Sequence, residues 1–303
     1  MFLYNHPMNP SPFQSEHDLQ EMRALLSRLG PAAAIVDFEE KMQMSSVRAN
    51  TCLWRQDGRL LAFACVDDYN NLCYETAPEA ALDALDALED EIVAWGVACQ
   101  RRLNAARGED GTLDFSCSPQ DARRLALMQR CGFEQSAFTS LHYRLSLLQA
   151  PAPAPFPAGF SWRSVGPADT LADLVALHRA AFGTDQMTEE YRAAICGAPN
   201  YIPELDLLAV APDGALAGFC ICGFNEPGDT TGYTDPIGTH PRYQRLGLAR
   251  ALVTVGLGLL RQRGAQAAEV GTSSENIGMQ KLAESLGFAC VAETLWFAKP
   301  VGD

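Results

Sequence analysis

His-Pro-Arg-Tyr-Gln-Arg-Leu-Gly-Leu-Ala-Arg, residues 240–250, is the stretch of sequence that decides the fold of this chain. Residues 232–239 before it predict a strand, and residues 248–263 after it predict an apolar helix that ends before Gly264. The first amides of such a helix have no intrahelical partner and lie at the positive end of its dipole, so they can bind phosphate. Because Gly247 lets a ligand approach the backbone closely, we expect a pyrophosphate site at this loop.

The spacing Gln244-x-x-Gly247-x-Ala249 resembles the acetyl-CoA loop, Gln/Arg-x-x-Gly-x-Gly/Ala, of the GNAT N-acetyltransferase superfamily. Two flanking features are similar to that family as well. The preceding strand ends in Ile237-Gly238-Thr239-His240-Pro241, and the following one, Ala267 to Thr272, leads into Ser274-Glu275-Asn276 and a helix closed by Leu286-Gly287-Phe288. The alternative is an ordinary turn between a strand and a helix in another α/β protein.

The resemblance implies that acetyl-CoA is the co-substrate and that residues of these motifs hold it. The implied binding residues are Ile237, Gly238, Thr239, Gln244, Arg245, Leu246, Gly247, Leu248, Ala249 and Asn276. Two of their roles stay open. Arg245 either reaches the 3′-phosphate of CoA or is a solvated cation at the helix start. Asn276 either bonds to the pantetheine arm or only caps its helix.

Acetyl transfer to an amine requires a group that accepts the proton of the ammonium, and a proton donor helps the thiolate to leave. Asp235 is the candidate base, because many members of the family carry a glutamate at this place in the strand; the alternative is a turn residue in an Asp-Pro pair. Glu226 and Asp229 are alternatives for orienting the ammonium. The tyrosine that commonly donates the proton is replaced by Ala283. Three alternatives stay open: Tyr233, Ser285 or a water donates the proton, the thiolate leaves unaided, or catalysis has been lost.

Composition limits the class of protein. The chain has 303 residues, 48% of them hydrophobic, which favours two domains of roughly 150 residues each. A net charge of −14 argues against nucleic acid as a partner, and the acidic surface serves either solubility or attraction of a cationic amine. No apolar run approaches the roughly 20 residues that span a bilayer, and residues 1–13 lack a signal pattern. We therefore expect a cytoplasmic protein without a membrane partner.

We expect no metal site. Cys220 and Cys222 lie in a predicted strand with no histidine or second cysteine pair at a ligand spacing, and the ten cysteines show no disulfide framework of a small secreted domain.

Prolines at 151, 153, 155 and 157 predict an extended connector between two halves that repeat one pattern. Each half has an amphipathic helix (Glu16 to Leu29; Thr170 to Phe182), then a hairpin (turns at 56–59 and 211–214), and later a helix that ends in Gly-Phe (132–133; 287–288). The expected fold class is α/β (α+β), with two tandem GNAT-like domains, each a mixed, mostly antiparallel sheet flanked by helices.

The first half has lost the phosphate loop. The corresponding residues, Ala77-Pro78-Glu79-Ala80-Ala81-Leu82-Asp83, include no glycine and place carboxylates where a pyrophosphate would bind. We expect residues 1–150 to form a degenerate GNAT-like domain without acetyl-CoA, residues 151–157 a linker, and residues 158–303 the acetyltransferase domain.

The expected function is transfer of an acetyl group from acetyl-CoA directly to a primary amine of a small molecule. The alternatives are an acyl-CoA-binding or sensing protein without catalysis, and an acyltransferase with another acyl donor or acceptor. The sequence identifies neither the acceptor nor the oligomeric state.

Overall fold

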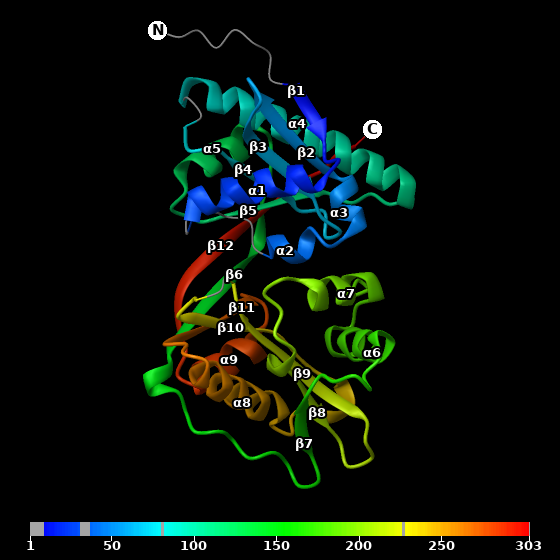
Figure 1. Cartoon of the computed structure of the whole chain (residues 1–303), viewed down its shortest axis with the longest axis vertical. Coiled ribbons are helices and arrows are strands. Elements are labelled where there is room, and N and C mark those ends of the chain that lie inside the picture. The colour runs from blue at the N-terminus through cyan, green and yellow to red at the C-terminus, as the bar shows by residue number, and fades with distance from the viewer. Residues whose placement is uncertain (1–8, 31–36, 80–81, 226–227, 303) are drawn as a thin grey trace. The chain divides into compact units, whose positions relative to one another are not determined.

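The computed structural model describes residues 9–30, 37–79, 82–225 and 228–302, which form two compact units (Figure 1). Unit 1 comprises residues 1–139 and 294–303, and unit 2 comprises residues 140–293. Strands β6 (Glu134–Ser146) and β12 (Ala289–Lys299) are each divided between the units. The compact units therefore do not coincide with the expected boundaries at 150 and 158, because both long strands continue past the unit boundary.

Unit 1 has an antiparallel sheet in the order β1-β2-β3-β4. A fifth strand, β5, is attached to it through one parallel bridge, Asn71 to Asp114, and pairs antiparallel with residues 295–299 of β12. Its elements are β1 (Asn9–Pro12), α1 (Glu16–Leu29), α2 (Phe38–Lys41), α3 (Ser45–Ala49), β2 (Thr51–Gln56), β3 (Arg59–Val66), β4 (Leu72–Thr76), α4 (Leu82–Arg107), β5 (Leu113–Cys117) and α5 (Ala122–Arg130).

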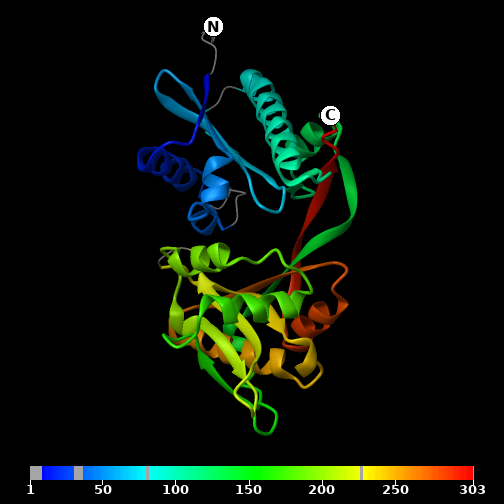
Figure 2. The ribbon, with the colours of Figure 1, turned by 90° about the vertical axis from the view of Figure 1, so that its right-hand side faces the viewer.

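Alternation along the strands of unit 1 produces two buried faces. Trp54 and Ala62 lie in the core cluster with α4. There the Trp54 ring packs edge-on against the Trp95 ring, with the ring centroids 5.7 Å apart. Phe63 points to the opposite face of the sheet and packs against Phe38 of α2, with the ring centroids 5.8 Å apart. Figure 2 shows α4 on one side of this sheet and α1 and α2 on the other.

Unit 2 repeats the order of elements, and its sheet runs β6-β11-β10-β9-β8-β7. Every recorded pair in it is antiparallel except β10 with β11, as expected for a mixed, mostly antiparallel sheet. The elements are β7 (Ser161–Ser164), α6 (Leu171–Phe182), α7 (Glu189–Gly197), η3 (Pro203–Leu205), β8 (Asp206–Val210), β9 (Leu216–Phe224), β10 (Thr231–Thr239), η4 (Pro241–Tyr243), α8 (Leu248–Gln262), β11 (Ala267–Ser273) and α9 (Ile277–Ser285), with η2 (Leu147–Gln149) after β6.

The predicted turns are present in both units. Gly58 and Gly214 adopt positive φ angles of 75° and 86° in the hairpin turns β2–β3 and β8–β9, which is the backbone geometry that favours glycine there. The proline-rich residues 151–157 carry no helix or strand, and the amide of Ala154 donates to Thr254 Oγ1 at 2.8 Å. The connector therefore packs on α8.

The two faces of the unit 2 sheet carry different helices. Cys220 and Cys222 of β9 belong to the core cluster under α8, whereas Phe219 and Ile221 belong to the cluster under α6 and α7. All ten cysteines are free thiols. Among the described residues, no helix is both long and apolar enough to cross a membrane, and no three His, Cys, Asp or Glu side chains gather as metal ligands would.

Helix α8 lies so close to β9 that one of its glycines has no room for a side chain. A Cβ at Gly256 would stand 2.5 Å from Cys222 Sγ, whereas a Cβ at Gly258 would meet nothing within 4 Å. We expect Gly256→Ala to lower the free energy of unfolding by about 1–3 kcal/mol through overpacking. Gly258→Ala, the matched control, should raise it by roughly 0.5–1 kcal/mol because alanine favours helix. Urea unfolding measures both, and equal stabilisation by the two substitutions would contradict the close approach.

Candidate active site

The loop before α8 presents a row of unoccupied backbone donors. Arg245 and Gly247 adopt positive φ angles of 67° and 88°, and Gly247 is the N-cap of α8. The first amide of this region with a partner in the described chain is that of Ala251, which donates to Gly247 O at 3.0 Å. The amides of residues 245–250 donate to no described residue, so several N–H groups at the positive end of the helix remain available to an anion.

Polar side chains hold this loop and surround it with positive charge. Gln244 Nε2 donates to Thr239 O at 3.3 Å, which ties the loop to the end of β10. Arg250, in the first turn of α8, donates to Ser285 Oγ at 2.7 Å. A cation at a helix N-terminus is electrostatically unfavourable unless an anion lies nearby. Arg250 was not predicted from the sequence, although an arginine in the first turn of a helix is an unusual placement that can be recognised there.

Strands β10 and β11 stop pairing soon after they begin. Their parallel register covers Thr231 to Tyr233 opposite Ala267 to Glu269, and no pair is recorded beyond it. Farther along, β11 pairs with β6 and β10 pairs with β9. The second half of β10, which includes Ile237, Gly238 and Thr239, therefore presents one edge that is not bonded to β11, directly before the loop.

The two candidate catalytic side chains lie on one face of β10. The ring of Tyr233 covers Gly223 of β9, since a Cβ there would stand 2.4 Å from Tyr233 Oη. Asp235 lies within β10, and its carboxylate covers Gly271 of β11, where a Cβ would stand 3.2 Å from Oδ2. Asp235 is exposed and sits where the register with β9 shifts, so it is a strand residue beside the interrupted ladder.

The remaining predicted residues divide by exposure. Gln244, Arg245 and Leu246 are exposed in the loop, and Ala249 is half-buried. Leu248 is fully buried, and Ile237 packs against the same core cluster under α8, so both side chains belong to the core. Glu226 lies outside the described residues.

Asn276 caps α9: its Oδ1 accepts from the amide of Met279 at 3.1 Å. Ala283 on the same helix is 1% exposed and belongs to the core cluster under α8. It offers no proton donor, in agreement with the sequence.

In unit 1, the strands equivalent to β10 and β11 carry a stack of aromatic and cationic side chains. Strands β4 and β5 share a single parallel bridge, and Tyr74 and Phe115 stack across them with ring centroids 5.6 Å apart. The guanidinium of Arg124 lies 4.9 Å from the Tyr74 ring, and Tyr74 Oη donates to Glu89 at 3.0 Å. Glu79, from the altered loop, pairs with Arg28, whereas Ala80 and Ala81 lie outside the described residues.

The C-terminal part of the chain is similar to known proteins. Residues 171–288 match the acetyltransferase (GNAT) family model. The mycothiol acetyltransferase of Kineococcus radiotolerans is 32% identical over 145 residues, which are 46% of each chain. The match thus spans about half the length of that curated relative.

Solved structures extend the similarity of fold to the whole chain. A GCN5-related N-acetyltransferase from Sphaerobacter thermophilus superposes with a TM-score of 0.68 at 20% identity, over 98% of this chain and 96% of that one. A tandem GNAT protein from the clavulanic acid biosynthesis pathway superposes with a TM-score of 0.70 at 17% sequence identity. The superposition covers 98% of this chain and 99% of that one. Residues 171–288 thus match the GNAT family model, and the expected fold of two tandem GNAT-like domains is confirmed.

The cap at α9 has a measurable contribution to stability. We expect Asn276→Ala to lower the free energy of unfolding by about 1 kcal/mol, because the Met279 amide loses its partner. Asn276→Asp keeps an acceptor and should cost much less. Thermal or urea unfolding of both variants checks this, and equal losses would mean that the side chain stabilises the chain in another way.

Proposed function

We propose that this chain, whose residues 171–288 match the GNAT family model, transfers the acetyl group of acetyl-CoA directly to a primary amine of a small molecule. The observation that carries the proposal is the meeting of two backbone surfaces: the edge of β10 that is not bonded to β11, and the amides of residues 245–250, which donate to no described residue. Together they fit an extended ligand that is amide-like along one part and anionic at the other.

Each part of acetyl-CoA finds a chemically matched group in this arrangement. The amides of residues 245–250 would bind the pyrophosphate. The edge of β10 that is not bonded to β11 would bond, at residues 237–239, to the amides of the pantetheine arm. Arg245 and Arg250 are exposed cations beside this loop and would pair with phosphate oxygens.

The chemical step needs a base more than an acid. Asp235, directly or through water, would take the proton from the ammonium so that the free amine attacks the thioester carbonyl. The carbon–sulfur bond then breaks, the CoA thiolate leaves with the electron pair, and the extra proton on the attacking nitrogen would pass to that thiolate, directly or through Tyr233 or a water. A thiol pKa near 8.5 makes this thiolate a tolerable leaving group, so Tyr233 or a water suffices as proton donor where Ala283 offers none.

Unit 1 would support the active domain without binding acetyl-CoA itself. The stack of Tyr74, Phe115 and Arg124 occupies the gap that would have to receive the pantetheine arm. We therefore propose one acetyl-CoA site in the chain, a small-molecule amine as the partner, and the cytoplasm as the location.

The second candidate function is binding of acyl-CoA without turnover. It is favoured by one observation, the buried Ala283 in place of the usual tyrosine. Release of CoA thiol in the presence of a panel of amines distinguishes the two functions, and thermal shifts with acetyl-, propionyl- and succinyl-CoA rank the donors.

Titration of acetyl-CoA into the full chain tests the binding site. We expect about one equivalent to bind, and Gly247→Glu to abolish binding because it adds a negative charge and a strained backbone at the phosphate loop. Gly264→Glu is the matched control, since Gly264 has φ 96° at the other end of α8 and, like Gly247, no atom near its Cβ. Two equivalents, or equal loss in both variants, would overturn the assignment.

Replacement of the base tests the chemistry. We expect Asp235→Asn to reduce kcat/KM by about 10²–10⁴-fold while acetyl-CoA affinity is unchanged. The deficit should shrink as pH rises, because more of the amine is then already deprotonated and needs no base. Thiol release measured from pH 6 to 10 checks this, with Asp213→Asn in the exposed β8–β9 turn as control. A deficit that is constant with pH would exclude Asp235 as the base.

A further inference from the structure

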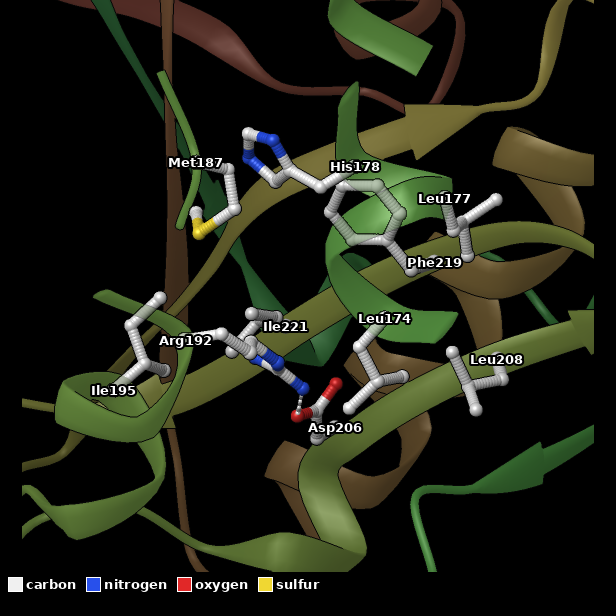
Figure 3. Close-up of a pocket in the computed structure, with 10 residues that line it drawn as sticks. All are labelled: Leu174, Leu177, His178, Met187, Arg192, Ile195, Asp206, Leu208, Phe219 and Ile221. Atoms are coloured by element: carbon white, nitrogen blue, oxygen red, sulfur yellow. Dashed lines mark hydrogen bonds and ion pairs between the residues drawn. The ribbon is translucent and has the colours of Figure 1, made fainter. Parts of the chain in front are cut away.

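A small cavity lies inside unit 2, between helices α6 and α7 and the face of strands β8 and β9 (Figure 3). Most of its wall is apolar, and the cavity measures about 10 Å³ as the space open to the centre of a water molecule. A volume of that size holds about one water-sized group. The apolar wall is formed in part by Leu174, Met187, Leu208, Phe219 and Ile221.

A buried ion pair, Arg192 with Asp206, interrupts this apolar wall. Arg192 Nη2 donates to Asp206 Oδ2, and Tyr201 Oη donates to the same oxygen at 2.7 Å. The two residues are only 5% and 1% exposed. Burial of two charges is expensive unless their remaining hydrogen-bonding capacity is satisfied.

That capacity is not satisfied within the chain. Arg192 Nη1 and Asp206 Oδ1, one donor and one acceptor, have no hydrogen-bond partner among the described residues, and neither has His178 Nδ1. A buried polar atom without a hydrogen-bond partner destabilises the folded chain. The three atoms belong to side chains that line the cavity (Figure 3), and a polar group beside the ion pair can satisfy the atoms of Arg192 and Asp206.

The charges of the wall select a neutral group. The arginine and the carboxylate already compensate each other, and a third charge would remain unpaired in a low-dielectric space. Burial, followed by the charge of Arg192, lowers the pKa of His178 to about 4, so its imidazole adds no charge at neutral pH. A hydroxyl fits these requirements, because one oxygen both donates to the carboxylate and accepts from the guanidinium.

The cavity and the candidate base lie on one face of the sheet, in one row across three strands. Asp206 of β8 is in register with Ile221 of β9. Ile221 in turn lies opposite the shifted segment of β10 that contains Asp235. Two strand spacings separate the backbones of Asp206 and Asp235 by roughly 10 Å.

We propose that this cavity receives a hydroxyl group of the acceptor, so that the chain prefers an amine that carries a hydroxyl several bonds from its nitrogen. The inference rests on the proposed function, because it places the nitrogen at Asp235. Met187 is the wall residue best suited to admit the stem of such a ligand, since its side chain is unbranched and adapts to irregular shapes.

Matched acceptors test the inference in the full chain. Linear amino alcohols from 2-aminoethanol to 8-amino-1-octanol are compared with alkylamines in which a methyl group replaces the hydroxyl. With acetyl-CoA, we expect at least one chain length at which the amino alcohol has a kcat/KM at least tenfold higher than its methyl counterpart. A site built around a hydroxyl rejects the analogue that lacks it.

A variant without the polar wall shows where the preference arises. Arg192→Met, Asp206→Leu and Tyr201→Phe are combined, because removing the whole group leaves no unpaired charge or hydroxyl behind. The triple variant should lose the preference, so that an amino alcohol and its methyl counterpart react with similar kcat/KM. Arg263→Met with Glu204→Leu, which removes an exposed ion pair of the same unit, should keep the preference. The comparison of acceptors on the unaltered chain does not depend on the folding of either variant.

Binding without an acyl donor separates the inference from the proposed function. The methyl resonance of Met187, assigned with Met187→Leu, should shift with the amino alcohol and not with its methyl counterpart. If this shift occurs but no amine releases thiol, the hydroxyl site stands and acetyl transfer is overturned. If thiol is released with no preference at any length, or the resonance does not move, the inference is overturned and the cavity holds a water only.

Discussion

The interruption of the ladder between β10 and β11 is the constraint on which the rest of unit 2 depends. A parallel pair that continued to Thr239 would satisfy the backbone of β10 on both edges and leave nothing for a ligand. Since the later residues of β11 pair with β6 and have no recorded pair in β10, the second half of β10 keeps one edge that is not bonded to β11. Such an edge is a site for unwanted strand addition unless something covers it. Here the loop of residues 240–247 follows at once, and α8 begins beside it.

In unit 1 the parallel pairing between the equivalent strands is also interrupted, but different side chains lie there. Its β4 and β5 also share almost no parallel pairing, yet two aromatic rings and an arginine fill the space between them. The stacking of the two rings and the cation over them stabilise the folded unit, whereas an open gap would lack these contacts. A few large side chains thus separate a closed copy of the fold from an open one, although the order of helices and strands is unchanged.

The sequence was sufficient for features whose chemistry is local. Gly58, Gly214 and Gly247 marked turns that need positive φ, and Asn276 marked a helix start. Features built from distant residues left no such pattern. Arg192 and Asp206 lie on a helix and a strand, and only the folded sheet joins them. The division of β6 and β12 was invisible for a related reason, because alternation along a strand continues unchanged where its neighbours change.

That division links the order of synthesis to the order of folding. Strand β5 of unit 1 takes its antiparallel partner from residues 295–299, which the ribosome makes after all of unit 2. Domains commonly fold as they emerge, the first one first. Here the first unit has to wait with an incomplete sheet while the second is made. The N-terminal half is therefore the later of the two to be completed, and its exposed strand is what a chaperone would meet on the growing chain.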